Sequence, residues 1–296
     1  MDVRLEELTS QIIGKYLGQN LYSSKGSLLL RKGTQISELH YNHIKEMGYQ
    51  SIYIQENNSN ELETDNLVIS ESLRAKAPTI LQDIFKKLTH QDRAIVAEGK
   101  KESIVLAENI LKEVNFKIKG GLKYLDLKRK SDYLYQHCIN VATYSILIGY
   151  RLHYHQLKLL DLGLAALLHD IGILFIDNAI LSKAGELSPA EFESVKSHTV
   201  KGFQHLGRQC FLKGLITIVA LQHHERFDGT GYPNGIAGRE INEFARIVAV
   251  ADFFDAYTSD RPYRRMHTIE EAVEKLKAEA GKAFDPDIVE EFLKFF

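Results

Sequence analysis

Two apolar runs that end at histidines constrain the fold of this chain more than any other feature. Residues 162–168 lead directly into His169 and Asp170. Residues 215–221 lead to two adjacent histidines and then to a glycine-rich loop (His223, His224; Gly229, Gly231, Gly235 and Gly238). Imidazoles are the commonest transition-metal ligands, and glycine lets backbone approach a ligand closely. The runs therefore predict buried helices that bring a histidine–carboxylate metal centre to a flexible substrate loop.

Two more histidines and an aspartate occupy inward positions on apolar helical stripes. They are His137, His198 and Asp252, the last within the apolar residues 247–254. Burying a carboxylate in such a helix costs several kcal/mol unless it is paired or bound to a cation. Singly, each residue fits a hydrogen-bonded core histidine or a buried salt bridge. Jointly, the five histidines and two aspartates indicate a metal centre.

Composition bounds the class of protein. A length of 296 residues predicts about two domains. The 37 basic and 39 acidic side chains nearly balance, which favours neither a nucleic-acid polymer nor a membrane surface as partner. No apolar run approaches the roughly 20 residues that span a bilayer, and the acidic N-terminus lacks the apolar core of a signal peptide. The two cysteines, Cys138 and Cys210, form no disulfide scaffold, so we expect a cytoplasmic protein.

Residues 1–57 predict a small α+β module. Residues 21–22 and 28–30 are apolar and flank a turn, which is the pattern of a short hairpin. Ser37 is placed to cap a helix, and residues 52–54 predict another strand. The module contains no cluster of ligands or nucleophiles, so we expect a regulatory or sensory role for it and no chemistry.

Residues 58–119 predict a linker followed by connecting helices. Residues 55–66 are polar and rich in Asn and Glu, as in a linker. Two apolar stripes of helical period follow, over residues 73–88 and 104–118. These helices are candidates for transmitting a signal or forming a homodimer. Simple packing on the following domain explains the stripes equally well.

Residues 120–296 predict a helical domain. Nearly every segment here has a helical period, and capping boxes begin at Ser188 and Thr268. Asp285 precedes a proline and marks a further helix start. The predicted fold is therefore mainly α, an all-α bundle preceded by a small α+β module.

The motifs of this helical domain resemble those of the HD-GYP family, a branch of the HD-domain metal-dependent phosphohydrolases. Residues 169–172 (HDIG) look like the family's HD motif. Residues 223–233 (HHERFDGTGYP) match its HHExxDGxGYP motif at every fixed position, and residues 260–264 match its DRPYR segment. The spacing between the motifs also fits. The resemblance implies an HD-type bundle over about residues 120–296, and residues 1–57 resemble, more weakly, a module often fused to it.

The resemblance implies a binuclear metal centre in which Asp170 bridges both ions. The remaining ligands would divide between the two sites (His137, His169 and Asp252 in one; His198, His223 and His224 in the other). The cofactors would be two divalent metal ions, with iron favoured and manganese or zinc as alternatives, because mixed imidazole and carboxylate ligands suit all three. Family members with a third metal carry a glutamate where this chain has Tyr133, which favours two ions over three.

The resemblance also implies hydrolysis of cyclic di-GMP to a linear dinucleotide or GMP, by a hydroxide that bridges the metals beside Asp170. Arg261 and Arg264 suit contacts to phosphate, since guanidinium donates bidentate hydrogen bonds; the alternative is an exposed basic turn. Tyr232 would donate to phosphate or only pack the loop. The GYP loop is also a candidate contact for a protein partner. Two carboxylates would brace this loop as hydrogen-bond acceptors (Glu225 and Asp228).

One departure from the family pattern leaves a second hypothesis open. Ile173 stands where the family's HDxGK motif has a lysine, a cation near the metals and the substrate phosphate. Its loss removes a charge-assisted contact typically worth ~1.5–3 kcal/mol. The alternative function is a metal-containing cyclic di-GMP receptor with little or no hydrolysis. A third hypothesis, an HD phosphohydrolase acting on another nucleotide, fits the complete GYP loop less well.

Overall fold

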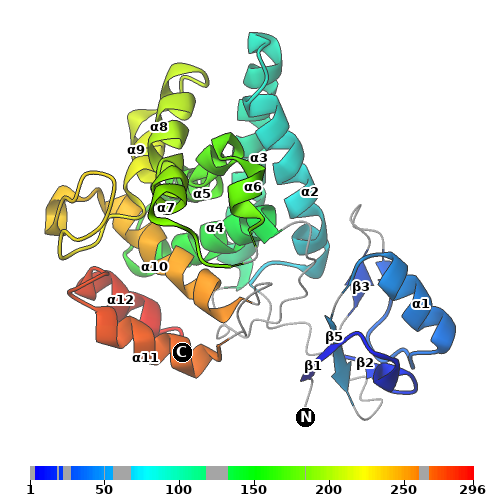
Figure 1. Cartoon of the computed structure of the whole chain (residues 1–296). Coiled ribbons are helices and arrows are strands. Elements are labelled where there is room, and N and C mark those ends of the chain that lie inside the picture. Colours follow the sequence, from blue (N-terminus) through cyan, green and yellow to red (C-terminus); the bar gives the residue numbers. More distant parts are fainter. Residues whose placement is uncertain are drawn as a thin grey trace.

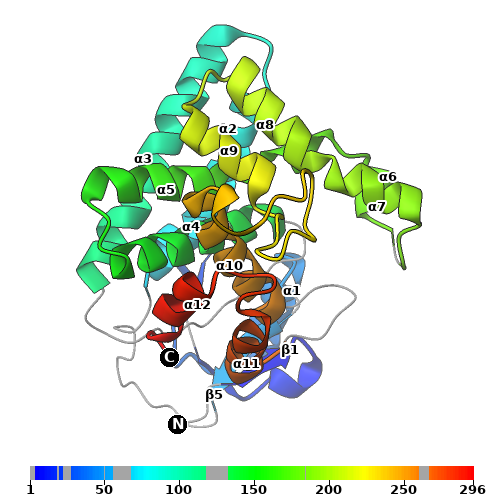
Figure 2. The ribbon, with the colours of Figure 1, turned by 90° about the vertical axis from the view of Figure 1, so that its left-hand side faces the viewer.

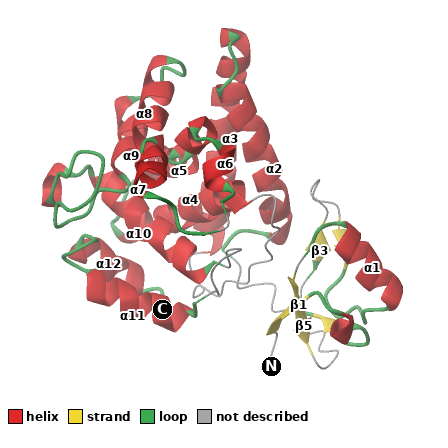
Figure 3. Ribbon diagram, in the orientation of Figure 1, coloured by secondary structure: helices red, strands yellow, loops and turns green. Residues whose placement is uncertain are grey.

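The chain has two parts in the computed structural model, a small N-terminal α+β part and a larger helical part (Figure 1). The strands of the described residues lie in the N-terminal part (Figure 3). The predicted fold class is therefore confirmed. The structure describes most of the chain (residues 4–18, 20–22, 28–49, 51–55, 68–117, 133–183, 185–259 and 267–296).

The N-terminal part packs one helix and a short hairpin with an antiparallel sheet. Its elements are β1 (Arg4–Glu7), the 3-10 helix η1 (Ser10–Ile12), β2 (Tyr16–Leu17), β3 (Leu21–Tyr22), β4 (Leu28–Leu30), α1 (Glu38–Glu46) and β5 (Ser51–Gln55). Within the described residues the sheet order is β1-β5-β2, and β3 pairs with β4. Ser37 caps α1 by accepting from the backbone N–H of His40. The predicted hairpin, helix and last strand are confirmed, whereas β1 and β2 were not predicted.

The start of the predicted linker is wrong. Gln55 ends β5, lies opposite Tyr16 of β2, and is only 4% exposed. Polar composition alone does not reveal backbone pairing, and this pairing extends the strand by one residue beyond its apolar stretch. The rest of the predicted linker, residues 56–66, lies outside the described residues.

The helical part is built around one core. Its elements are α2 (Glu71–Leu88), α3 (Arg93–Lys117), α4 (Tyr133–Arg151), α5 (Gln156–Leu168), η3 (Ile171–Phe175), α6 (Asn178–Leu181), α7 (Pro189–Lys196), α8 (His198–Arg208), α9 (Gly214–Gln222), η4 (Gly238–Glu240), α10 (Glu243–Thr258), α11 (Ile269–Glu279) and α12 (Pro286–Leu293). Buried side chains of α2 and α3 belong to the same cluster as those of α4, α5, α9 and α10. The connecting helices therefore pack on the bundle. No helix in the described part of the chain is long and apolar enough to cross a membrane.

The predicted helix starts are confirmed by their caps. Ser188 and Thr268 form capping boxes at α7 and α11. In each, the hydroxyl accepts from the backbone N–H of a glutamate three residues later, and the carboxylate of that glutamate accepts from the backbone N–H of the capping residue. The Asp285 carboxylate caps α12, which begins at Pro286. These caps satisfy backbone donors that helix starts leave without partners, so they fix where each helix begins.

A close backbone contact places the turn after α5 against the start of α8. A Cβ atom on Gly172, in η3, would lie 1.9 Å from the carbonyl oxygen of His198 and 2.8 Å from the backbone nitrogen of Gly202. Only glycine fits this contact without a shift of backbone. The contact sets the His169–Asp170 turn beside His198. The next helices along the chain, α6 and α7, project together from one side of the bundle (Figure 2).

Candidate metal centre

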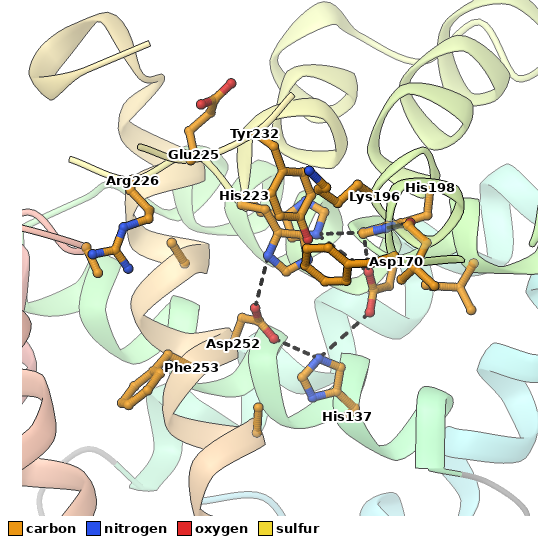
Figure 4. A pocket seen from close by; sticks show the side chains of 18 of the residues that line it. His137, Asp170, Lys196, His198, His223, Glu225, Arg226, Tyr232, Asp252 and Phe253 are labelled. Atoms are coloured by element: carbon orange, nitrogen blue, oxygen red, sulfur yellow. Dashed lines mark hydrogen bonds and ion pairs between the residues drawn. The ribbon is translucent and has the colours of Figure 1, made fainter. Parts of the chain in front are cut away.

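Helices α4, α5, α8, α9 and α10 carry the seven predicted ligands to one place. Each ligand lies in one of these helices or directly after it (His137 in α4; His169 and Asp170 after α5; His198 at the start of α8; His223 and His224 after α9; Asp252 in α10). Their side chains turn toward one another, as Figure 4 shows for the labelled members of the set. Four of the five histidines are at most 5% exposed, so these imidazoles meet in the interior of the bundle.

The ligand atoms form two groups that could each hold a metal ion. One group is Asp170, His198, His223 and His224, and the other is His137, His169 and Asp252. This is the division that the family resemblance implied.

The two oxygens of Asp170 face different groups. Oδ1 lies 3.3 Å from His198 Nε2 and 3.5 Å from His223 Nε2. Oδ2 lies 3.5 Å from His169 Nε2 and 3.9 Å from His137 Nε2. A carboxylate in this position can give one oxygen to each of two ions. The side chain of Asp170 therefore lies between the two groups.

Backbone contacts orient the imidazoles for a cation. The Nδ1 atoms of His169 and His198 lie 2.7 Å from the carbonyl oxygens of Ala166 and Val195, and His223 Nδ1 lies 3.1 Å from the Val219 oxygen. A carbonyl oxygen only accepts, so each Nδ1 carries a proton, and in the neutral imidazole Nε2 then keeps its lone pair. Nε2 of His169 is buried and has no hydrogen-bond partner. An acceptor that points into the cluster in this way fits a metal ligand.

Burial and charge set the protonation of the cluster. Burial alone would raise the pKa of Asp252, but the hydrogen bond from His137 and the charge of the surrounding imidazoles together outweigh it, and the pKa falls well below its usual range. Burial lowers the pKa of His169 to about 4, so this imidazole is neutral near pH 7. For His137, burial is outweighed by the hydrogen bonds to Asp252 and Asp255, and the pKa rises to about 10. A metal ion at His137 Nε2 must therefore displace a proton.

Asp255, which the sequence analysis did not single out, holds His137 in place. Its carboxylate lies 2.7 Å from His137 Nδ1 and accepts from Asn140 Nδ2 at 2.7 Å. The side chain of Asp255 is 2% exposed. A carboxylate behind an imidazole fixes the tautomer and makes the other nitrogen a better ligand. The available signal was a second aspartate one helical turn after Asp252 in an apolar helix.

We expect Asp255→Asn to weaken metal binding at the group that contains His137 by about 10- to 100-fold. The amide keeps the shape of the side chain but loses the charge that supports the imidazole. The affinity is measured by titration against a competing chelator at fixed pH, with Asp161→Asn, a partly exposed carboxylate of α5, as the control. Unchanged affinity in Asp255→Asn would refute the supporting role.

A pocket of about 1150 Å³ opens above the two groups. Its wall includes Ile173 and Leu174 from η3, Phe192 and Lys196 from α7, and Tyr232 from the loop after α9. The Tyr232 ring lies 4.9 Å from the ring of His224. Burial and the nearby carboxylates raise the pKa of Tyr232 well above its usual range, so its hydroxyl stays protonated and can donate. Lys196, two residues before His198, is a pocket residue that the sequence analysis missed.

Hydrogen bonds brace the loop that carries Tyr232. Glu225 is 3% exposed, and its carboxylate accepts from the backbone N–H groups of Asn234 at 2.7 Å and Gly235 at 3.1 Å. Asp228 accepts from the backbone N–H of Thr230 at 3.0 Å. Both carboxylates thus have the bracing contacts expected of them. The loop is held against the pocket by these bonds.

The two arginines predicted to contact phosphate lie outside the described part of the chain. Arg261 and Arg264 lie outside the described residues, which stop at Ser259 and resume at His267. Their contacts to phosphate therefore remain a prediction.

The chain is similar to proteins of known family. The model of the HD domain family matches residues 121–288. A cyclic di-GMP phosphodiesterase of Thermotoga maritima is 35% identical over 234 residues, which are 79% of this chain and 62% of the relative. A 3'3'-cGAMP-specific phosphodiesterase of Vibrio cholerae is 40% identical over 158 residues, which are 53% of this chain and 34% of that relative. The match thus spans less than two thirds of either relative.

A solved structure has the same fold. It is an HDG"Y"P protein from Bdellovibrio bacteriovorus, with a TM-score of 0.60 and 17% identity over 99% of both chains. The family match covers the helices that carry all seven candidate ligands. The chain therefore belongs to the HD domain family, as its resemblance to the HD-GYP branch predicted.

Proposed function

We propose that the chain is a cyclic di-GMP phosphodiesterase with a binuclear metal centre. The observation that carries this proposal is the position of Asp170, whose two oxygens face two separate groups of imidazoles at the base of one pocket. The pocket volume of about 1150 Å³ is above the usual range of about 300–1,000 Å³ for small-ligand sites, so a cyclic dinucleotide has room. The phosphodiesterase names of the relatives support the same activity.

We propose two divalent metal ions as the cofactors, with iron favoured and manganese or zinc as alternatives. Three imidazoles in one group, and two imidazoles with a carboxylate in the other, suit divalent transition metals. When bound, two such ions would supply an activated water and neutralise charge on a phosphodiester. Seven ligands serve two ions better than three.

The residues of the chain then have distinct tasks. Asp170 holds the two groups at one separation, and the carbonyl contacts of the histidines keep each Nε2 directed inward. The Tyr232 hydroxyl, which stays protonated, donates to a phosphate oxygen. Arg261 and Arg264 bind phosphate through bidentate hydrogen bonds. The apolar wall of the pocket receives the bases.

The receptor hypothesis rests on Ile173 and is the weaker one. The relatives are named as phosphodiesterases, which supports turnover. A different substrate has an observation in its favour, since one relative is named as specific for 3'3'-cGAMP. The substrate test must therefore include both cyclic dinucleotides.

The direct test is anaerobic purification, metal analysis, and incubation with cyclic di-GMP or 3'3'-cGAMP, followed by chromatography of the products. We expect about two metal ions per chain and conversion of cyclic di-GMP to a linear dinucleotide or GMP. Faster conversion of 3'3'-cGAMP would mean that this compound, and not cyclic di-GMP, is the preferred substrate. A metal-loaded protein that binds but hydrolyses neither compound would be a receptor, and a protein without metal would defeat the proposal.

We propose that the three predicted segments of the chain have different roles. Residues 1–57 form a regulatory module, residues 58–119 connect it, and residues 120–296 carry the metal centre. The N-terminal part has its own buried cluster, separate from the core of the bundle, which supports the first boundary. We further propose a cytoplasmic protein that acts without a nucleic-acid polymer. We also propose that the chain forms a homodimer and that the GYP loop contacts a protein partner.

A chain that begins at Asn66 is expected to keep its metals and its basal hydrolysis. It retains α2 and all later elements, and among the described residues the core of the bundle contains no side chain from residues 1–57. Metal content and specific activity are compared with the full chain at matched thermal stability. Loss of metal from a truncated chain that still folds would show that the N-terminal part completes the site.

A further inference from the structure

The pocket wall holds a cation whose role the proposed function leaves open. Lys196 and Arg226 are the lysine and arginine side chains among the described residues that line the pocket. The guanidinium of Arg226 is engaged by the loop and by α11 (Thr230 at 2.9 Å, Asp228 at 3.2 Å and Glu279 at 3.4 Å). Lys196 instead forms an ion pair with Glu193, whose side chain is 69% exposed. Exposed pairs are weak, so an anionic ligand can displace this glutamate.

Two aromatic rings hold the Lys196 ammonium at the pocket. Its Nζ lies 5.2 Å from the centre of the Phe192 ring and 5.5 Å from the centre of the Tyr232 ring. Both distances allow attraction between a cation and a ring face. Figure 4 shows Lys196 beside Tyr232, whose ring packs 4.9 Å from the ligand His224. The Lys196 side chain is 24% exposed, so the charge is partly shielded from water.

The junction of α7 and α8 fixes Lys196 relative to the metal ligands. Lys196 is the last residue of α7, and His198 begins α8. The Val195 carbonyl accepts from Nδ1 of His198 at 2.7 Å, so one turn positions both the ligand and the lysine. Ile173 lines the same pocket from η3 and offers no charge. The charge missing at position 173 is thus available from a neighbouring wall.

We propose that Lys196 binds a non-bridging phosphate oxygen of the substrate and supplies the positive charge that Ile173 lacks. The inference rests on the proposed phosphodiesterase function. A cyclic dinucleotide carries a negative charge on each of two phosphodiesters, and Asp170 and Asp252 add negative charge at the base of the pocket. A flexible ammonium that can exchange Glu193 for phosphate offsets part of this charge.

The test compares Lys196→Met with Lys196→Arg and with the double variant Ile173→Lys/Lys196→Met. The control is Lys277→Met, which removes a lysine of α11 that also pairs with a glutamate three residues earlier, Glu274. Each protein is assayed for metal content, melting temperature, kcat and KM for cyclic di-GMP, and calorimetric affinity for the linear product pGpG.

We expect Lys196→Met to lower kcat/KM roughly 10- to 100-fold and to weaken pGpG binding, with metal content and melting temperature unchanged. Lys196→Arg should keep most of the activity. The double variant should recover at least about tenfold over Lys196→Met, because it returns an ammonium from the other wall. Lys277→Met should match the wild type.

Results that contradict the role of Lys196 differ from the result that contradicts the proposed function. Equal values for Lys196→Met and Lys277→Met would overturn the inference. Loss of metal in Lys196→Met, with no recovery in the arginine or double variant, would overturn it as well, because the lysine would then only support the His198 turn. If the metal-loaded wild type binds pGpG without hydrolysing cyclic di-GMP, the proposed function fails, and the comparison of pGpG affinities alone decides the role of Lys196.

Discussion

Asp170→Ala should deplete both metal ions and reduce hydrolysis at least roughly a thousandfold. The reason is geometric, since one oxygen of Asp170 faces His198 and His223 and the other faces His169 and His137. Removing the side chain takes a ligand from both groups at once. Activated water and charge neutralisation by two ions are together worth several kcal/mol, and each 1.36 kcal/mol is about tenfold in rate.

A comparison with His198→Ala separates the bridging role from simple ligation. His198 belongs to one group, so its loss should deplete mainly one ion. Metal per chain is measured after anaerobic purification, and Asp161→Ala serves as the control because it removes a carboxylate from the outer face of α5. Two retained ions in Asp170→Ala would show that the aspartate does not bridge.

The resemblance to the HD-GYP motifs implied the set of candidate ligands, but it did not reveal the residues that support them. The structure brings the side chains of the seven candidate ligands together in two groups. Asp255 lies in the same apolar helix as Asp252, and sequence alone does not tell which of the two aspartates faces the other candidate ligands and which supports a histidine. Lys196 belongs to no motif, and a lysine at a helix end is usually solvated, so its place in the pocket came only from the structure.

In the fold, local patterns were likewise predictable, whereas pairing between distant segments was not. Caps at Ser188, Thr268 and Asp285 were predictable because each is a local pattern with a local cause. The strand β1, with sequence RLEE, carries three charged residues in four and forms because β5 pairs with it. The two-residue strand β2 is too short for any period. Pairing between distant segments leaves little trace in either segment, and this is why these strands were missed.

Gly172→Ala should destabilise the protein by about 1–3 kcal/mol and lower the occupancy of the metal group that contains His198. The added Cβ would lie 1.9 Å from the His198 carbonyl oxygen and 2.8 Å from the Gly202 nitrogen. Both obstacles are backbone atoms, so no side chain can rotate away. Relief requires η3 to separate from α8, and His198 is the first residue of α8. The methyl group therefore acts on stability and on the metal centre together.

Gly207→Ala in α8 is the control, since a Cβ at that position meets nothing within 4 Å. Alanine is the better helix former by about 1 kcal/mol, so this variant should be as stable as the wild type or more stable. Melting temperature and metal content are measured for both variants. For a helical part of this size, the destabilisation of Gly172→Ala corresponds to a fall in Tm of roughly 2–12 °C. If Gly172→Ala keeps its Tm and both ions, the contact between η3 and α8 does not set the position of His198.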